Sequence, residues 1–297
     1  MFQDITKNKI KSFSIVCIFI LIITLILYYV CLAFEFSAPI AIAFALAFSI
    51  LVSGISYYNS DKLILAVTKA RPATIEEDKK VVQILEALMI SSGLSHMPKL
   101  YVVVDPQPNA FATGRNPAHS IICVTTGLLE KLEYYELEGV IAHEMAHIKN
   151  YDILLSTIVT VMVGFLVMLS DIFTRSLFWG RDRDRDSGGN AILMLVGLVL
   201  LILSPILGKL IQMAMSRRRE FLADATAIEF TRNPDGLINA LRKLDSDTNQ
   251  LRVANKATEN LYIVSPFKSN ATKRKKASLF STHPSIEDRV HALQNIK

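Results

Sequence analysis

The sequence predicts a mainly helical α+β integral membrane protein with four transmembrane helices and a polar domain at the cytoplasmic face, which the third and fourth spans divide in two. Three observations predict this fold class. First, 51% of the 297 residues are hydrophobic and only 20% are charged, below the roughly 25% that is usual in soluble domains. Second, the apolar residues are concentrated in four blocks. Third, the rest of the chain is long enough for about one compact domain.

Each apolar block has the length of a membrane span. The blocks are residues 12–34, 36–60, 153–170 and 191–215. The first is uncharged and would form a helix about 35 Å long, enough to cross a hydrocarbon core of about 30 Å. The fourth is interrupted by Pro205 and Lys209. The chain is therefore expected to have four parts. Residues 1–60 form an anchor and a transmembrane hairpin, and residues 61–152 form the first half of the polar domain. Residues 153–215 form a second transmembrane hairpin, and residues 216–297 form the second half of the polar domain.

Basic residues near the spans predict the orientation, because they are enriched on the cytoplasmic side. They precede the first span and follow the second and the fourth, whereas the turn between the first two spans contains Glu35 and no basic residue. Both termini and both polar halves are therefore expected in the cytoplasm. The loop between spans three and four is an exception to this rule, because it should lie outside the cytoplasm and yet residues 181–186 alternate Arg and Asp. The sequence therefore does not decide whether spans three and four cross the membrane fully. The net charge of +5 is attributed to contact with the lipid bilayer and not to nucleic acid.

The polar segments have the periodicity of helices and short strands. Thr74-Ile75-Glu76-Glu77 has the pattern of a capping box and predicts a helix start. Strands are expected at residues 99–104, 110–113 and 120–125. Helices are expected at residues 135–150, 220–230 and 234–244, and a last one starting at residues 282–284.

The most informative motif is His143-Glu144-Met145-Ala146-His147, an HExxH pattern on a predicted helix. Positions i and i+4 share one helix face, so both imidazoles can reach the same ion. Zinc suits such a site because it accepts neutral imidazoles in an open tetrahedral geometry. Glu144 would then take a proton from water and pass it to a leaving amine. The alternative is a helix with two structural or solvated histidines.

A catalytic zinc needs a third protein ligand. The candidate is Glu220, which shares a helix face with Asp224 at position i+4. One of the two carboxylates can bind the metal, and the other can accept the free ring N–H of a ligand histidine. Taken without the HExxH motif, such an acidic pair is typical of a solvated helix face.

Two further features are candidates for substrate chemistry. His283, just before a helix-starting proline, and Arg289, two turns along, can offer donors to an oxyanion. The alternating segment Asn109, Ala110, Phe111 and Ala112 predicts an exposed edge strand. Such a strand can hold an extended peptide substrate by backbone pairing.

Together these motifs resemble the HtpX-type membrane zinc metallopeptidases, which are HExxH gluzincins related to the CaaX prenyl endopeptidases. The resemblance covers nearly the whole chain and rests on residues 109–114, 143–150, 219–224, 282–284 and 289. CaaX prenyl endopeptidases are larger and have more spans around an enclosed chamber, so four candidate spans favour the HtpX type.

The resemblance implies a zincin-like catalytic domain at the cytoplasmic face of the plasma membrane, with one Zn²⁺ per chain. It also implies a role in stress response, by cleavage of misfolded or damaged membrane proteins, with other membrane proteases as possible partners. It implies His143, His147 and Glu220 as zinc ligands, Glu144 as general base, Asp224 as a support for a ligand, and His283 with Arg289 as transition-state donors.

Two other functions compete with a protease. A catalytically silent zinc-binding adaptor could present substrates to another protease, but such a protein has no need of Glu144. A zinc transporter needs ionisable residues within its spans, and the first two blocks contain none.

The order of the motifs also predicts that the zinc site lies near the membrane surface, because His147 precedes the third span and Glu220 follows the fourth.

Overall fold

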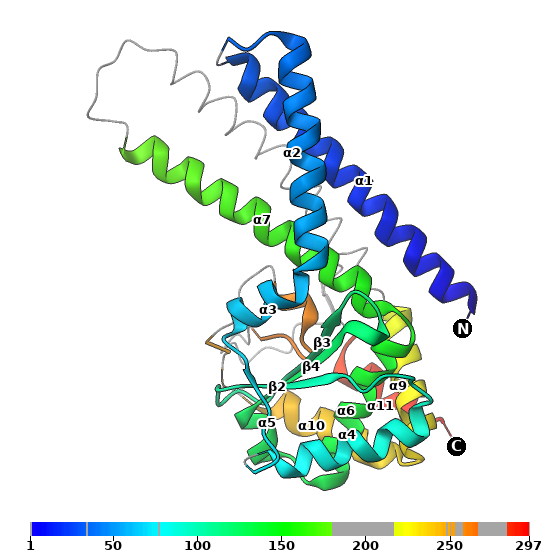
Figure 1. Ribbon diagram of the computed structural model, residues 1–297. Helices are drawn as coiled ribbons and strands as arrows, with labels where there is room; N and C mark the ends of the chain where they lie inside the picture. Colours follow the sequence, from blue (N-terminus) through cyan, green and yellow to red (C-terminus); the bar gives the residue numbers. More distant parts are fainter. Residues whose placement is uncertain are drawn as a thin grey trace.

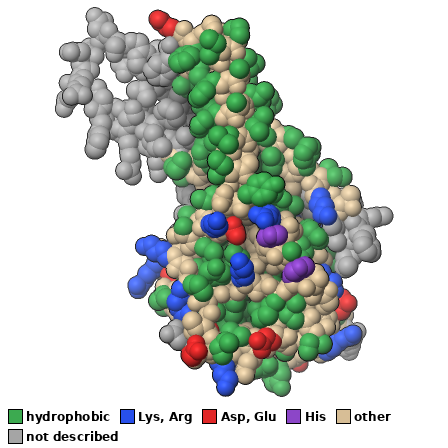
Figure 2. Space-filling model, in the orientation of Figure 1, with side chains coloured by type: hydrophobic (Ala, Val, Ile, Leu, Met, Phe, Trp, Pro, Cys, Tyr) green, Lys and Arg blue, Asp and Glu red, His purple; other side chains and the backbone are tan. Residues whose placement is uncertain are grey.

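Three long helices rise from one side of a folded domain in the computed structural model (Figure 1). The structure describes residues 2–33, 35–76, 78–179, 217–247, 249, 251–252, 258–266 and 284–296. The long helices are α1 (Phe2–Ala33), α2 (Ala38–Tyr58) and α7 (Asp152–Trp179). We call these three helices the arm. The face of the arm that is visible in Figure 2 is largely hydrophobic, and charged side chains lie on the domain below it.

Two helices of the arm are long and apolar enough to cross a membrane: residues 9–32 of α1 and 38–58 of α2. They confirm apolar helices at the first two predicted spans, and their crossing of the membrane as a hairpin stays a prediction. The third predicted span coincides with α7, which follows α6 (Tyr134–Lys149) after a bend of 86°. The fourth predicted span and the Arg/Asp run at residues 181–186 lie outside the described residues.

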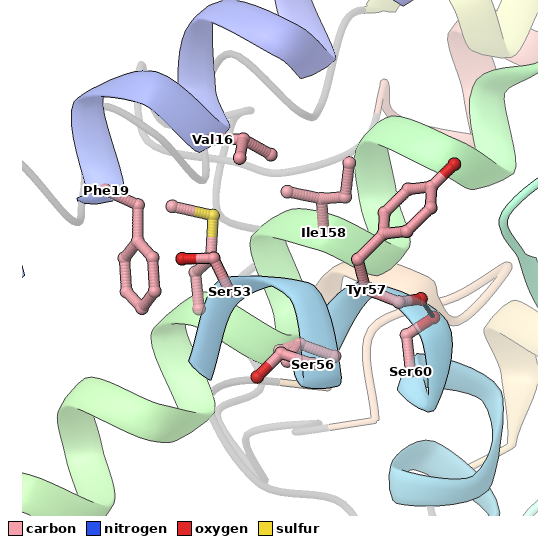
Figure 3. A pocket seen from close by; sticks show the side chains of 9 residues that line it. Val16, Phe19, Ser53, Ser56, Tyr57, Ser60 and Ile158 are labelled. Atoms are coloured by element: carbon pink, nitrogen blue, oxygen red, sulfur yellow. Dashed lines mark hydrogen bonds between the residues drawn. The ribbon is translucent and has the colours of Figure 1, made fainter. Parts of the chain in front are cut away.

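The arm is held together by apolar packing between α1 and α7. Ile15, Phe19 and Ile23 of α1 are buried against Leu155 and Val159 of α7. Helix α2 meets both of them at a cavity of about 30 Å³, which serine residues help to line (Figure 3). The cavity is lined by Val16, Phe19, Ser53, Ser56, Tyr57, Ser60, Ile158, Val161 and Met162. Small residues such as serine let membrane helices approach closely.

The domain contains one mixed sheet with the strand order β1-β2-β4-β3. The strands are β1 (Arg71–Pro72), β2 (Lys99–Val103), β3 (Ala110–Gly114) and β4 (Ser120–Thr125). Strands β2 and β4 are parallel, and the other two pairs are antiparallel. The three predicted strands are confirmed to within one residue. Strand β1 was not predicted, because two residues carry no periodicity.

Helix α6 is the centre of the domain core. Its residues Leu137, Val140, Ile141 and Met145 are fully buried. Around it pack the sheet and three helices, α4 (Lys79–Ser92), α9 (Arg217–Thr231) and α10 (Pro234–Ser246). The remaining elements are α3 (Ser60–Thr68), α5 (Thr126–Lys131), α11 (Ile286–Gln294) and two short 3₁₀ turns, η1 (Pro117–His119) and η3 (Glu259–Leu261).

The predicted start of the helix at Thr74 was wrong. Helix α4 begins at Lys79, because the Asp78 carboxylate accepts the Thr74 N–H at 3.0 Å and pairs with Arg71 at 2.8 Å. These contacts hold the preceding residues in a turn. The last helix also begins later than predicted. It starts at Ile286, where the Ser285 hydroxyl caps it by accepting the Asp288 N–H at 3.0 Å.

Buried amide side chains fasten the segment 258–266 to the sheet. Asn109 Nδ2 donates to the Val264 carbonyl at 3.0 Å, and the Ile263 N–H donates to the Ala110 carbonyl at 3.0 Å. Gln107 Nε2 donates to the Asn249 carbonyl at 2.8 Å. Because Gln107 and Asn109 are fully buried, losing these bonds would leave buried polar groups unpaired. These contacts hold residues from far along the chain against the sheet.

The contact between α6 and α10 depends on Gly139. A Cβ at this position would lie 2.8 Å from the Leu237 nitrogen and 2.9 Å from its Cα. We expect Gly139→Ala to separate the two helices and to destabilise the fold by about 1–3 kcal/mol, the usual cost of overpacking. Thermal unfolding in detergent measures this. Gly54→Ala is the matched control, because a Cβ there has nothing within 4 Å; an equal loss in both variants would contradict the prediction.

Candidate metal centre

Helix α6 presents His143 and His147 side by side on one face. Their Nε2 atoms lie 3.2 Å apart, and the two rings meet edge to face with centroids 4.7 Å apart. His143 is fully buried, and His147 keeps a small exposed fraction. This is the arrangement that the i and i+4 spacing predicts.

Glu220 of α9 completes a group of three ligand atoms. Its Oε2 lies 3.8 Å from His143 Nε2, and its Oε1 lies 3.7 Å from His147 Nε2. Within the described part of the chain, these three residues form a group that could hold a metal ion, with all ligand atoms within 4.8 Å of one another. Two imidazole nitrogens and one carboxylate are a donor set that suits zinc and leaves a position open.

The outer nitrogen of each histidine is held by a carboxylate. His143 Nδ1 lies 3.0 Å from Asp224 Oδ1, and His147 Nδ1 lies 3.1 Å from Asp152 Oδ2. A carboxylate at Nδ1 accepts the ring proton, so the lone pair of the neutral ring is on Nε2, facing the other ligands. This arrangement fits the zinc donor set. The sequence predicted Asp224 in this position but missed Asp152, whose side chain reaches His147 only because of the bend between α6 and α7.

Arg289 lies under the site and not on the surface. Its side chain has 0% exposure, and it contacts Asp224 with two nitrogens, Nε at 2.9 Å and Nη2 at 2.6 Å. Its Nη1 lies 3.8 Å from Glu220 Oε2. Two of its donors are thus directed at Asp224, which makes Arg289 a support for the ligands. His283, its expected companion, lies outside the described residues.

Glu144 is buried beside the three ligands and faces strand β3. The Ala112 backbone lies close to its carboxylate and favours the ionised form. Burial raises the pKa of Glu144 to about 7, and the Glu220 charge acts in the same direction, against the charges of His147 and Arg289. A carboxyl group with a pKa near neutrality is well matched to accept and return a proton.

The two histidines have opposite pKa shifts. Burial lowers the pKa of His143 to about 4, and the Arg289 charge adds to this, so the ring is neutral. Burial alone would lower the pKa of His147 too, but the hydrogen bond to Asp152 and the charges of Glu220, Asp152 and Glu144 raise it to about 9. Below that pH a metal ion must displace a proton from His147 in order to bind.

Strand β3 lies at the edge of the sheet, as predicted, but the expectation that it is exposed was wrong. All five of its residues are buried, because the segment 262–264 and helix α7 cover it. Asn109 bonds to Ala110 and Val264, and the Phe111 ring packs against Tyr262 with centroids 5.1 Å apart. These two side chains therefore hold the fold together.

The far end of β3 is attached to the arm. Thr113 Oγ1 lies 2.9 Å from Thr157 Oγ1 of α7, and the Gly114 N–H donates to the same oxygen at 3.1 Å. Ala112 lies between these contacts and those of Ala110. In the antiparallel pair of β3 and β4, every second residue directs its backbone N–H and C=O groups away from the partner strand. Ala112 is such a residue, and its backbone faces Glu144.

The fold and the site together define a class of protein: a zinc metallopeptidase attached to a membrane by apolar helices. The comparisons give its family. The model of peptidase family M48 matches residues 76–297, so the chain belongs to that family, and its relatives show it to be of the HtpX type.

Three relatives named Protease HtpX homolog illustrate the similarity. One from Caldanaerobacter subterraneus subsp. tengcongensis is 41% identical, covering 98% of this chain and 96% of the relative. One from Dictyoglomus thermophilum is 43% identical, covering 99% and 94%. One from Listeria monocytogenes serotype 4a is 42% identical, covering 100% of both. Among solved structures, Ste24p of S. mikatae has the same fold, with a TM-score of 0.50 at 20% identity over 99% of this chain and 67% of that one.

The Asp224–Arg289 pair provides a stability test of the site. We expect Arg289→Leu to destabilise the metal-free protein by about 3–5 kcal/mol, because it leaves the Asp224 carboxylate buried without its cation. Chemical unfolding in detergent with a chelator measures the loss. The double variant Arg289→Leu with Asp224→Leu should recover part of it. Arg71→Leu is the control, since that arginine is about one-third exposed; an equal loss there would refute the assignment.

Proposed function

We propose that this protein is a membrane-embedded zinc endopeptidase that cleaves misfolded or damaged membrane proteins at the cytoplasmic face. The observation that carries the proposal is the convergence of His143, His147 and Glu220 beside the buried carboxyl group of Glu144. Zinc held by these three ligands would polarise the scissile carbonyl and lower the pKa of a water molecule.

The chain's own residues supply the proton transfers and the positioning. Glu144 takes the proton of the attacking water and later donates it to the leaving amine, a role that its pKa of about 7 supports. Asp224 fixes the tautomer of His143 by accepting its Nδ1 proton. Arg289 keeps Asp224 ionised, since the arginine charge and hydrogen bonds hold the pKa of that carboxyl below its usual value despite burial. Oxyanion stabilisation by His283 and Arg289 stays a prediction.

The substrate backbone is proposed to pair with β3 at Ala112. The neighbouring backbone groups of β3 that point away from β4 already have hydrogen-bond partners. The Ala110 carbonyl accepts from the Ile263 N–H, and the Gly114 N–H donates to the Thr157 hydroxyl. The Ala112 position is the part of this edge that lies beside Glu144. A site this short requires an extended segment that is not already paired. Misfolded proteins expose such segments, which supports the proposed substrate class.

The position of the site supports membrane-proximal substrates. Asp152, in contact with His147, is the first residue of α7, and α7 packs against the membrane-spanning part of α1. We propose four spans, with the second hairpin formed by residues 153–215, and both termini and the catalytic domain in the cytoplasm. The basic residues that flank the spans support this orientation.

Reporter fusions test the orientation. Alkaline phosphatase, which is active only outside the cytoplasm, should be inactive when fused after residue 297 and active when inserted at the α1–α2 turn near Glu35. A fluorescent protein fused after residue 297 should give bright cells. The proposed orientation fails if the C-terminal phosphatase fusion is active.

Replacing Glu144 tests the mechanism. We expect Glu144→Gln to bind zinc as the wild type does and to lose cleavage of an unfolded substrate such as casein by at least about 10²-fold, because the general base is gone. Metal content and casein breakdown are measured on protein purified in detergent with a chelator and then given zinc.

Glu138→Gln is the matched control, because Glu138 lies on the same helix outside the group of ligands. It should retain both zinc and activity. Wild-type turnover in Glu144→Gln would contradict the mechanism. Zinc binding without cleavage in the wild type itself would favour the silent adaptor.

A further inference from the structure

The carboxylate that supports His147 has the same kind of surroundings as the one that supports His143. Asp224 lies between His143 and Arg289, and Asp152 lies between His147, at 3.1 Å, and Arg219, with Oδ1 4.0 Å from Arg219 Nη1. Asp152 and Arg219 are both largely buried, with side-chain exposures of 5% and 13%. Each ligand histidine therefore has its own carboxylate. Each carboxylate also has an arginine nearby, hydrogen-bonded at 2.6 Å in the Asp224–Arg289 pair and at the longer ion-pair distance of 4.0 Å in the Asp152–Arg219 pair.

We propose that Asp152 is a positioning residue for His147 and that, with Arg219, it joins the metal site to the base of the arm. The proposal rests on the proposed function, since it assumes that His147 is a zinc ligand. Asp152 acts through His147: its carboxylate accepts the Nδ1 proton and directs Nε2 towards Glu220 and His143.

The backbone between α6 and α7 is arranged to bring this carboxylate back over the ring. The chain turns by 86° between the two helices, and Tyr151, at the bend, has a left-handed backbone with φ of 59°. That conformation is unfavourable for a residue with a side chain. The Lys9 ammonium of α1 lies over the Tyr151 ring, 4.5 Å from its centroid. A contact from α1 of the arm therefore stabilises the bend, and the bend places Asp152 next to His147.

A simpler role for Asp152 is to stabilise the first turn of α7, where negative charge is favourable. That role needs no histidine contact and no burial, because a solvent-exposed acid performs it. A buried carboxylate is costly unless it is paired, and Asp152 contacts His147 at 3.1 Å and forms a longer ion pair with Arg219 at 4.0 Å. Burial against a candidate ligand therefore favours the positioning role.

The two members of this pair belong to different helices. Asp152 opens α7, the third helix of the arm, and Arg219 lies in the first turn of α9, next to Glu220. A shift of α7 against α9 would change the Asp152–Arg219 contact and with it the orientation of His147. The affinity for zinc should therefore depend on how the arm sits on the domain.

The test measures the zinc dissociation constant, by competition with a fluorescent chelator, on metal-free protein in detergent. Asp152→Leu should raise the Kd by about 10–100-fold, the usual effect of removing such a support. Asp152→Asn should raise it less, because an amide oxygen can still accept the Nδ1 proton. Arg219→Gln should raise it as well. Absorption bands of bound Co²⁺ should shift in Asp152→Asn, which reports on ligand geometry independently of stability.

Asp78→Asn is the matched control, because Asp78 is a buried carboxylate paired with an arginine, Arg71, far from the site. It should lower the unfolding temperature and leave the Kd unchanged. An unchanged Kd and unchanged Co²⁺ bands in Asp152→Asn would overturn the proposal, even if Asp152→Leu fails to fold. If Glu144→Gln binds zinc normally but still cleaves, the proposed function fails while this inference stands. If the wild type binds no zinc, both fail.

Discussion

The buried contact between α6 and α9 is the interaction on which the site depends. The ligand atoms of two histidines on α6 and one glutamate on α9 all lie within 4.8 Å of one another. The two helices that carry them share one apolar core. Burying so many ionisable groups is unfavourable unless each finds a partner. Asp224 with Arg289 and Asp152 with Arg219 provide those partners, so the same charges that orient the ligands also make their burial possible.

The arm and the catalytic residues are linked through the first turns of α7. Asp152 contacts His147, and one and a half turns later Thr157 holds the end of β3. Strand β3 in turn places the Ala112 backbone beside Glu144. One helix of the arm thus contacts both a candidate metal ligand and the strand beside the general base. Parts that lie far apart in the chain are thus brought together around one site.

Local patterns in the sequence predicted much of the fold and the core of the site. The HExxH spacing defines one helix face, so His143, Glu144 and His147 could be placed without a structure, and the β-branched runs located three strands. Features that depend on tertiary contacts could not be predicted. The burial of β3 arises from residues 262–264, far along the chain, and Asp152 reaches His147 only through the bend at Tyr151. Arg289 has the sequence context of a surface cation, and only its pairing with Asp224 explains its burial.

The central claim is that His143, His147 and Glu220 hold one zinc ion, and X-ray absorption at the zinc edge tests it most directly. Combined with metal analysis of purified protein, it should show about one zinc per chain, with nitrogen and oxygen ligands at about 2.0–2.1 Å and the outer-shell scattering of two imidazoles. His143→Ala should lose zinc. Sulfur ligands at about 2.3 Å, or full zinc occupancy in His143→Ala, would contradict the account.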